Sequence, residues 1–243
     1  MARKTGMDEA LRRFDEIDRP HGVIVSLDAD CTVEENYFTS ICDELLNKKD
    51  RSACSIYFEH LLEGEEYPQI NYTYTTLYEL HMRYYARGLN YSGFPYPFHT
   101  IGSALAVKAL DYKKAGGMNR RRAGEDFYFI QKLVPRGGFF SLNSTTVYPS
   151  SRISSRTPFG TGASMIKFIE NPGQDFLTYN VNAFKELKSL FGEIEILFDS
   201  DTGQMEKYYN ELPEGLRSFI NEEEWLRHIS EIQANTAGKA SFR

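Results

Sequence analysis

The chain has 243 residues, a formal net charge of −6 and a hydrophobic content of 41%. This length allows one domain with a substantial core plus an appendage, and the acidic balance gives no support to a broad attraction to nucleic acid. No apolar run approaches the roughly 20 residues of a bilayer-spanning helix, and the polar start lacks the apolar stretch of a secretion signal. We therefore expect a soluble, cytoplasmic globular protein without a nucleic-acid partner.

The N-terminal part predicts a helix, a buried strand and a second helix. Apolar residues recur at helical spacing across residues 6–17, and the segment 22–27 (GVIVSL) is short, β-branched and nearly uncharged, as in a buried strand. Thr32 and Glu35 form a capping-box pattern, which predicts a helix from about Val33. Four apolar side chains of that helix would face inward: Phe38, Ile41, Leu45 and Leu46.

The rest of the chain continues to alternate between predicted strands and helices, and its last part is predicted to be helical. We expect strands at 53–58, 103–107 and 139–147 and helices at about 70–87 and 125–134. This βαβ rhythm predicts an α/β fold with a mainly parallel sheet flanked by helices. Beyond about Asn171 the pattern is helical, so we expect a core at 1–170 and a helical extension at 171–243.

Two aspartates follow the first predicted strand directly. Asp28 and Asp30 are separated by one residue and lie at the carboxyl end of the strand, the edge at which open α/β sheets bind ligands. Their carboxylates suit magnesium or manganese, whose remaining positions a diphosphate can fill. Acidic turns that cap the next helix are also common, so this motif alone leaves both interpretations open.

A second acidic pair opens a later predicted helix. Glu125 and Asp126 follow a glycine-containing turn, where an acid can complement the helix dipole. Alternatively, one carboxylate accepts a proton from an attacking hydroxyl while the other positions it or the acceptor. Arg152 and Arg156 flank a serine-rich stretch that continues into a glycine-containing segment, and guanidinium groups and exposed amides both suit diphosphate oxygens. Surface arginines are equally common without such a role.

The combination resembles family 2 glycosyltransferases of the GT-A fold. The resemblance rests on the ordered segments ARKTG from Ala2, VIVSLDADC around the aspartates, and GSALAVKALDYKKAGGMNRRRAGEDFYFIQKL, and it covers roughly residues 2–160. It implies a partial, Rossmann-like GT-A sheet and transfer of a sugar from a nucleotide-sugar donor to a saccharide or other hydroxyl acceptor. It also implies an inverting mechanism and a need for Mn²⁺ or Mg²⁺.

The resemblance also implies a role for each candidate residue. Asp28 would lie near the donor ribose or the metal, and Asp30 would coordinate the metal that bridges the donor diphosphate. Asp126 matches the catalytic base, with Glu125 beside it at the acceptor site. Arg3 would lie near the nucleotide, while Arg152 and Arg156 belong to a segment similar to a loop that closes over the donor.

One departure from the family pattern changes what we expect of the isolated chain. In such enzymes about three strand-helix units precede the Asp-x-Asp motif, whereas here it begins at residue 28, so the N-terminal nucleotide-binding half is expected to be absent. The chain would then be a fragment, a truncated protein or one part of a split enzyme. We expect self-association through an exposed sheet edge, and peripheral membrane association is left open. The alternatives are a non-catalytic acceptor-binding or assembly fragment and a metal-dependent nucleotidyl or phosphoryl transferase.

Overall fold

A computed structural model describes residues 2–121, 124–152, 166 and 176–239. The chain divides into two compact units. An α/β unit comprises residues 1–82 and 98–176, and a helical unit comprises residues 83–97 and 177–243. The helical unit therefore draws on two separate parts of the chain. The predicted boundary at 170/171 falls outside the described residues and stays a prediction.

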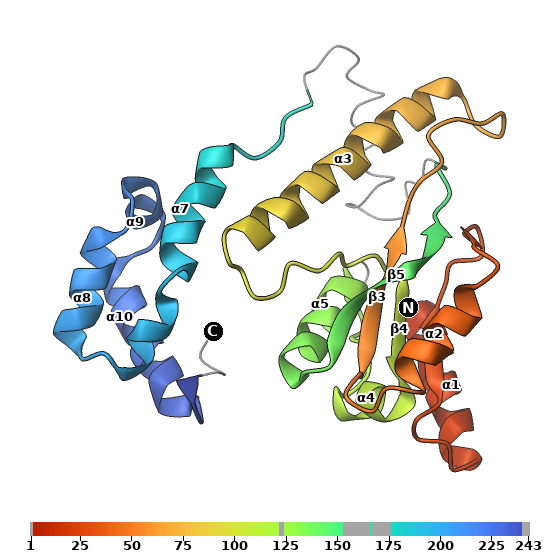
Figure 1. Cartoon of the computed structure of the whole chain (residues 1–243), viewed down its shortest axis with the longest axis horizontal. Helices are drawn as coiled ribbons and strands as arrows, with labels where there is room; N and C mark the ends of the chain where they lie inside the picture. The colour runs from red at the N-terminus through yellow and green to blue at the C-terminus, as the bar shows by residue number, and fades with distance from the viewer. Residues whose placement is uncertain (1, 122–123, 153–165, 167–175, 240–243) are drawn as a thin grey trace. The chain divides into compact units, whose positions relative to one another are not determined.

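The α/β unit is built on a curled sheet with the strand order β1-β4-β3-β5-β2. Its strands are β1 (Val23–Ser26), β2 (Thr32–Val33), β3 (Ala53–Phe58), β4 (Leu105–Lys108) and β5 (Phe139–Tyr148). Its helical segments are α1 (Ala2–Glu16), α2 (Tyr37–Leu45), α4 (Ala109–Lys114), α5 (Glu125–Leu133) and the 3-10 turn η1 (Val134–Arg136). The long helix α3 (Gln69–Tyr91) begins in this unit and continues into the helical unit. Figure 1 shows helices α1, α2, α4 and α5 grouped around the strands.

The prediction of a mainly parallel sheet is wrong, because the sheet is mixed. Only β3 and β5 pair in parallel, whereas β1 with β4, β3 with β4, and β2 with β5 are antiparallel among the described residues. Hydrophobic pattern reports that a strand is buried but not the direction of its neighbour. The long helix α3 and the loop after it return the chain so that β4 runs against both of its neighbours.

The predicted helix start at Val33 is also wrong. Thr32 and Val33 form β2, which pairs with Tyr148 and Val147 of β5, and α2 begins only at Tyr37. Backbone groups that enter a sheet ladder are unavailable for a capping box. Of the four side chains expected to face inward, Ile41 and Leu45 are buried and Phe38 and Leu46 are exposed.

The sheet separates two apolar clusters. On one face, α1, α4 and α5 pack on alternate side chains of the strands, and on the other face α2 packs on the remaining ones. Within β4, Leu105 and Val107 belong to the first cluster, while Ala106 belongs to the second, as the two-residue repeat of a strand requires. Strand β1 is an end strand and pairs only with β4 among the described residues. Self-association through its other edge stays a prediction.

The helical unit has a core of its own. Its segments after residue 176 are α7 (Val181–Phe191), η2 (Ile194–Asp199), α8 (Thr202–Glu211), α9 (Glu214–Phe219) and α10 (Glu222–Asn235). Trp225 stacks on Tyr208 and lies in a cluster with Leu216, whereas Phe219 is 89% exposed. An Asp201–Gln204 capping box starts α8. None of the helices in the described ranges combines the length and low polarity needed to cross a membrane.

Candidate active site

Arg3 links the two acidic motifs of the sequence. Its Nη2 lies 2.9 Å from Oδ1 of Asp28, and its Nε lies 3.6 Å from Oε1 of Glu125. The Arg3 and Glu125 side chains are only 18% and 19% exposed, and that of Asp28 is 51% exposed. One guanidinium group therefore holds together carboxylates that are almost a hundred residues apart in sequence.

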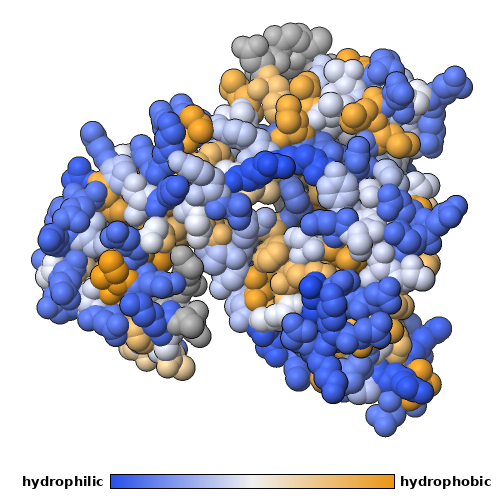
Figure 2. Space-filling view, viewed as in Figure 1, coloured by the Kyte–Doolittle hydropathy of each residue, from blue (hydrophilic) through white to orange (hydrophobic). Residues whose placement is uncertain are grey.

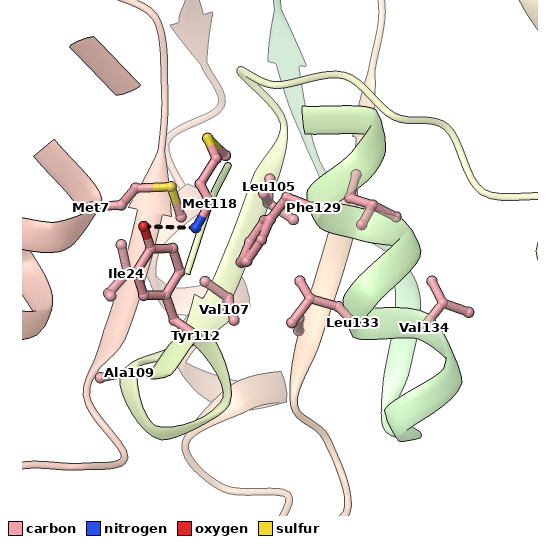
Figure 3. Packing of buried hydrophobic residues seen from close by; sticks show 12 residues of the cluster. Met7, Ile24, Leu105, Val107, Ala109, Tyr112, Met118, Phe129, Leu133 and Val134 are labelled. Atoms are coloured by element: carbon pink, nitrogen blue, oxygen red, sulfur yellow. Dashed lines mark hydrogen bonds between the residues drawn. The ribbon is translucent and has the colours of Figure 1, made fainter. Parts of the chain in front are cut away.

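Core packing explains why these groups meet. Met7, one turn after Arg3 on α1, and Phe129, one turn after Glu125 on α5, are buried in the same apolar cluster on one face of the sheet. Figure 3 shows Met7, Phe129 and Leu105 of β4 together in this cluster. Because both helices are anchored on one face just after their first turn, their N-terminal ends meet at one edge of the sheet. That edge is where β1 ends and Asp28 follows.

Contacts with a core residue also hold the loop before α5 in place. The Tyr112 hydroxyl accepts a hydrogen bond from the backbone N–H of Met118 at 3.1 Å, as the dashed line in Figure 3 shows, and donates to Asp8 Oδ1 at 2.7 Å. Tyr112 thus ties α4 to α1 and to the start of the loop. Gly124 then has a positive φ of 70° at the N-cap of α5, a conformation that glycine adopts without steric cost.

Asp126 is partly buried next to Glu125 and Arg3. Burial raises the pKa of its carboxyl above the ordinary value of 3.8, and the neighbouring Glu125 raises it further. A hydrogen bond at 2.8 Å from the backbone N–H of Phe127 and the positive charge of Arg3 act in the opposite direction but do not cancel the effect of burial. A carboxylate with a raised pKa is a better proton acceptor than an exposed one.

Gly102 and Ser26, which carry no chemical motif of their own, complete the site. A Cβ on Gly102 would lie 2.7 Å from Oδ2 of Asp126 and closer still to the guanidinium of Arg3. The buried Ser26 hydroxyl donates to the carbonyl of Gly102 at 2.7 Å and accepts from Arg3 Nη1 at 3.3 Å. A glycine before a strand can mark a close approach of other groups; this was the only sequence signal for Gly102, and Ser26 had none.

Asp30 has a different partner. Its Oδ2 lies 2.5 Å from Nη2 of Arg152, and the side chains are 40% and 45% exposed. The turn between the two aspartates is closed by a hydrogen bond at 3.1 Å from the N–H of Cys31 to the carbonyl of Asp28. The structure therefore brings Arg3, Asp28, Glu125 and Asp126 together and couples Asp30 to Arg152. Arg156 lies outside the described residues.

The carboxylates of Asp28 and Asp30 fit a divalent cation that is shared with a diphosphate. Asp28 and Asp30 supply hard carboxylate oxygens, and each uses one oxygen for its arginine. No group of three or more His, Cys, Asp or Glu side chains suited to a metal occurs in the described part of the chain. Magnesium is usually bound by one or two carboxylates together with substrate phosphates rather than by an all-protein cage, so two aspartates are consistent with such a site.

Comparison with known proteins gives one positive result. Neither the curated proteins nor the solved structures contain a match to this chain. A family model described as "Glycosyl transferase family group 2" matches residues 23–216, well over half of the chain. The match includes both acidic motifs and extends into the helical unit. The chain therefore belongs to glycosyl transferase family 2, whose members use nucleotide-sugar donors.

Proposed function

We propose that this protein transfers a sugar from a nucleotide-sugar donor to a hydroxyl acceptor with inversion of the anomeric centre. The observation that supports this proposal most is the meeting of Asp28, Glu125 and Asp126 around the guanidinium of Arg3. It combines, at one end of the sheet, a carboxylate suited to accept a proton with a carboxylate suited to the donor side. Family membership supports the same class of reaction.

In the proposed reaction Asp126 is the general base. Its carboxylate takes the proton of the acceptor hydroxyl while that oxygen forms a bond to the anomeric carbon. The bond from the anomeric carbon to the donor diphosphate breaks on the opposite face, and the diphosphate leaves with its electron pair. Glu125 lies beside the base and orients the acceptor, and Arg3 keeps Asp126 and Asp28 in fixed positions through its contacts with both motifs.

The donor side of the proposed site consists of Asp28, Asp30 and Arg152. Asp28 and Asp30 would hold Mn²⁺ or Mg²⁺, which when bound offsets charge on the leaving diphosphate. Arg152 is already oriented toward Asp30, and a guanidinium can also bind phosphate oxygens through paired hydrogen bonds. Arg156 is proposed for the same role on sequence grounds alone.

Titration calorimetry with a set of nucleotide sugars, with and without Mn²⁺, tests the proposal directly. We expect weak binding that strengthens with Mn²⁺, followed by release of nucleoside diphosphate when a hydroxyl acceptor is added. Absence of binding to every donor would favour a non-catalytic acceptor-binding or assembly role. Release of pyrophosphate from a nucleoside triphosphate would instead favour nucleotidyl transfer.

Gly102→Ala is expected to lower transfer by about 10- to 100-fold, because the added methyl group displaces the Arg3 guanidinium and small misplacements of catalytic groups have effects of this size. The same assay should be run on Gly6→Ala, since Gly6 lies in α1 and a Cβ there meets nothing within 4 Å. That control should keep its activity and gain slightly in stability from the higher helix propensity of alanine. Wild-type turnover in Gly102→Ala would show that the position of Arg3 does not matter for transfer.

A further inference from the structure

A basic hollow lies at the end of the sheet that is opposite the candidate active site, where strands start or finish. The starts of β1, β3 and β5 and the end of β4 meet there, since Val23 pairs with Lys108, and Ala53 pairs with both Val107 and Phe139. The hollow has a volume of about 420 Å³ and is lined by residues from the loops before these strands and from α4. Figure 2 shows mainly hydrophilic surface around α4.

The residues that line this hollow carry a net positive charge, whereas the chain as a whole is negatively charged. Five cationic side chains line it: Lys49, Arg51, Lys108, Lys114 and Arg136. His21 also lines it, and the acids in its wall are Asp50 and Asp111. Five lysines and arginines against two aspartates make a local positive excess in a protein whose formal net charge is −6. Such a local field attracts anions even when the whole molecule is acidic.

Two of the cations are held by the protein itself. The buried Lys108 donates from Nζ to the carbonyl of Lys48 at 3.0 Å. Nη1 of Arg51 lies 3.1 Å from Oε2 of Glu44. The Arg51 guanidinium also stacks over the ring of Phe140, with Cζ 3.7 Å from the ring centroid. These contacts hold the ammonium group of Lys108 and the guanidinium group of Arg51 in place before any ligand arrives.

The other three cations are available to a ligand. Lys49, Lys114 and Arg136 are exposed, and their side chains form no ion pair or hydrogen bond with the residues that the structure describes. They come from three different segments: the loop before β3, helix α4 and the turn η1. Side chains that converge from separate segments can surround a compact anion, whereas a single charged helix face cannot.

The wall between these segments is closely packed. The Ser52 hydroxyl donates to the carbonyl of Gly137 at 2.7 Å, and the Ser52 N–H donates to the carbonyl of Gly138 at 2.9 Å. Gly138 has a φ of +73°, and a Cβ there would lie 2.9 Å from the backbone nitrogen of Ser52. The glycine turn and the loop that carries Lys49 are thus held at a fixed spacing, which lowers the entropy lost when an anion binds.

We propose that this hollow binds the phosphate group of a ligand, either free phosphate or diphosphate or the headgroup of an acidic phospholipid. Lysine and arginine side chains are the usual partners of phosphate oxygens, and the volume accommodates a compact anion. The site is separate from the edge that carries Asp28 and Asp126, so it does not depend on sugar transfer by this chain.

Amide NMR during titration with inorganic phosphate, without divalent cations, tests the proposal at the level of single residues. We expect saturable shifts of the Ser52, Gly137 and Gly138 amides. The double variant Lys114→Ala/Arg136→Ala should weaken binding by at least about tenfold, because each charge-assisted hydrogen bond contributes roughly this factor or more. Lys185→Ala, which removes an exposed lysine from α7, should bind phosphate as the wild type does.

The source of the phosphate is distinguished by co-sedimentation with vesicles. Binding to phosphatidylglycerol vesicles but not to phosphatidylcholine vesicles, lost in the double variant, would assign a lipid headgroup. Phosphate binding without vesicle binding would assign a free phosphate ligand. The proposal is overturned if the three amides do not shift at millimolar phosphate, or if the folded double variant binds phosphate as tightly as the wild type.

Discussion

Asp126→Asn is expected to reduce turnover by at least about 100-fold, the effect typical of losing a general base. Asparagine keeps the shape and much of the hydrogen bonding of aspartate but does not accept a proton at neutral pH. Donor affinity should persist, because the proposed donor contacts come from Asp28, Asp30 and Arg152. Steady-state release of nucleoside diphosphate, together with donor calorimetry on the same sample, separates the two effects.

Asp43→Asn is a suitable control, since Asp43 is an exposed residue of α2, the helix on the other face of the sheet. It should leave turnover unchanged. Near-normal turnover in Asp126→Asn would move the base role to Glu125 or to another group.

Asp126→Asn should also stabilise the fold at neutral pH. Burial raises the pKa of Asp126 above 3.8, so the folded state disfavours the ionised carboxylate more than the unfolded state does. The stabilising contribution of the protonated acid is complete below pH 3.8 and is lost as the pH rises through the folded-state pKa. Asp126→Asn removes this loss, and its midpoint of thermal unfolding should exceed that of the wild type at pH 7 but not at pH 3.5. A lower midpoint at pH 7 would mean that the charge interaction with Arg3 outweighs desolvation.

The second large effect is expected from Asp30→Ala, which should abolish Mn²⁺-dependent donor binding. Removing one of two proposed carboxylate ligands leaves too few protein contacts for a cation that is otherwise bound by the diphosphate and water. Fold stability should change little, because the Asp30–Arg152 pair is exposed and such pairs contribute roughly 0 to 1 kcal/mol. Donor calorimetry with and without Mn²⁺ and a thermal melt measure the two properties.

Asp43→Ala provides the matched loss of one exposed carboxylate, and it should retain Mn²⁺-dependent binding. If Asp30→Ala is folded and binds the donor with an unchanged response to Mn²⁺, Asp30 is not a metal ligand. An increase in donor affinity without Mn²⁺ would point instead to release of Arg152 for direct contact with the diphosphate.

Sequence pattern located most elements of the α/β unit but not their arrangement. Predicted strands at 53–58 and 139–147 and the predicted helix from Glu125 agree closely with the structure, because each has a strong local signal of burial or of a helix start. The antiparallel direction of β4 and the β2–β5 pair had no such signal. Strand pairing depends on residues far away in sequence, and the two-residue β2 is too short to show periodicity.

The candidate site divides in the same way. The sequence by itself determined that Asp28 follows a buried strand and that Asp126 opens a helix, since local hydrophobic pattern places both motifs at the ends of elements. Only the tertiary structure decided that Arg3 joins them, that a Cβ on Gly102 would displace the Arg3 guanidinium, and that Asp126 is buried enough to raise its pKa. These properties arise when α1 and α5 pack on one face of the sheet, and both contact and desolvation depend on distances in space that residue spacing along the chain does not encode.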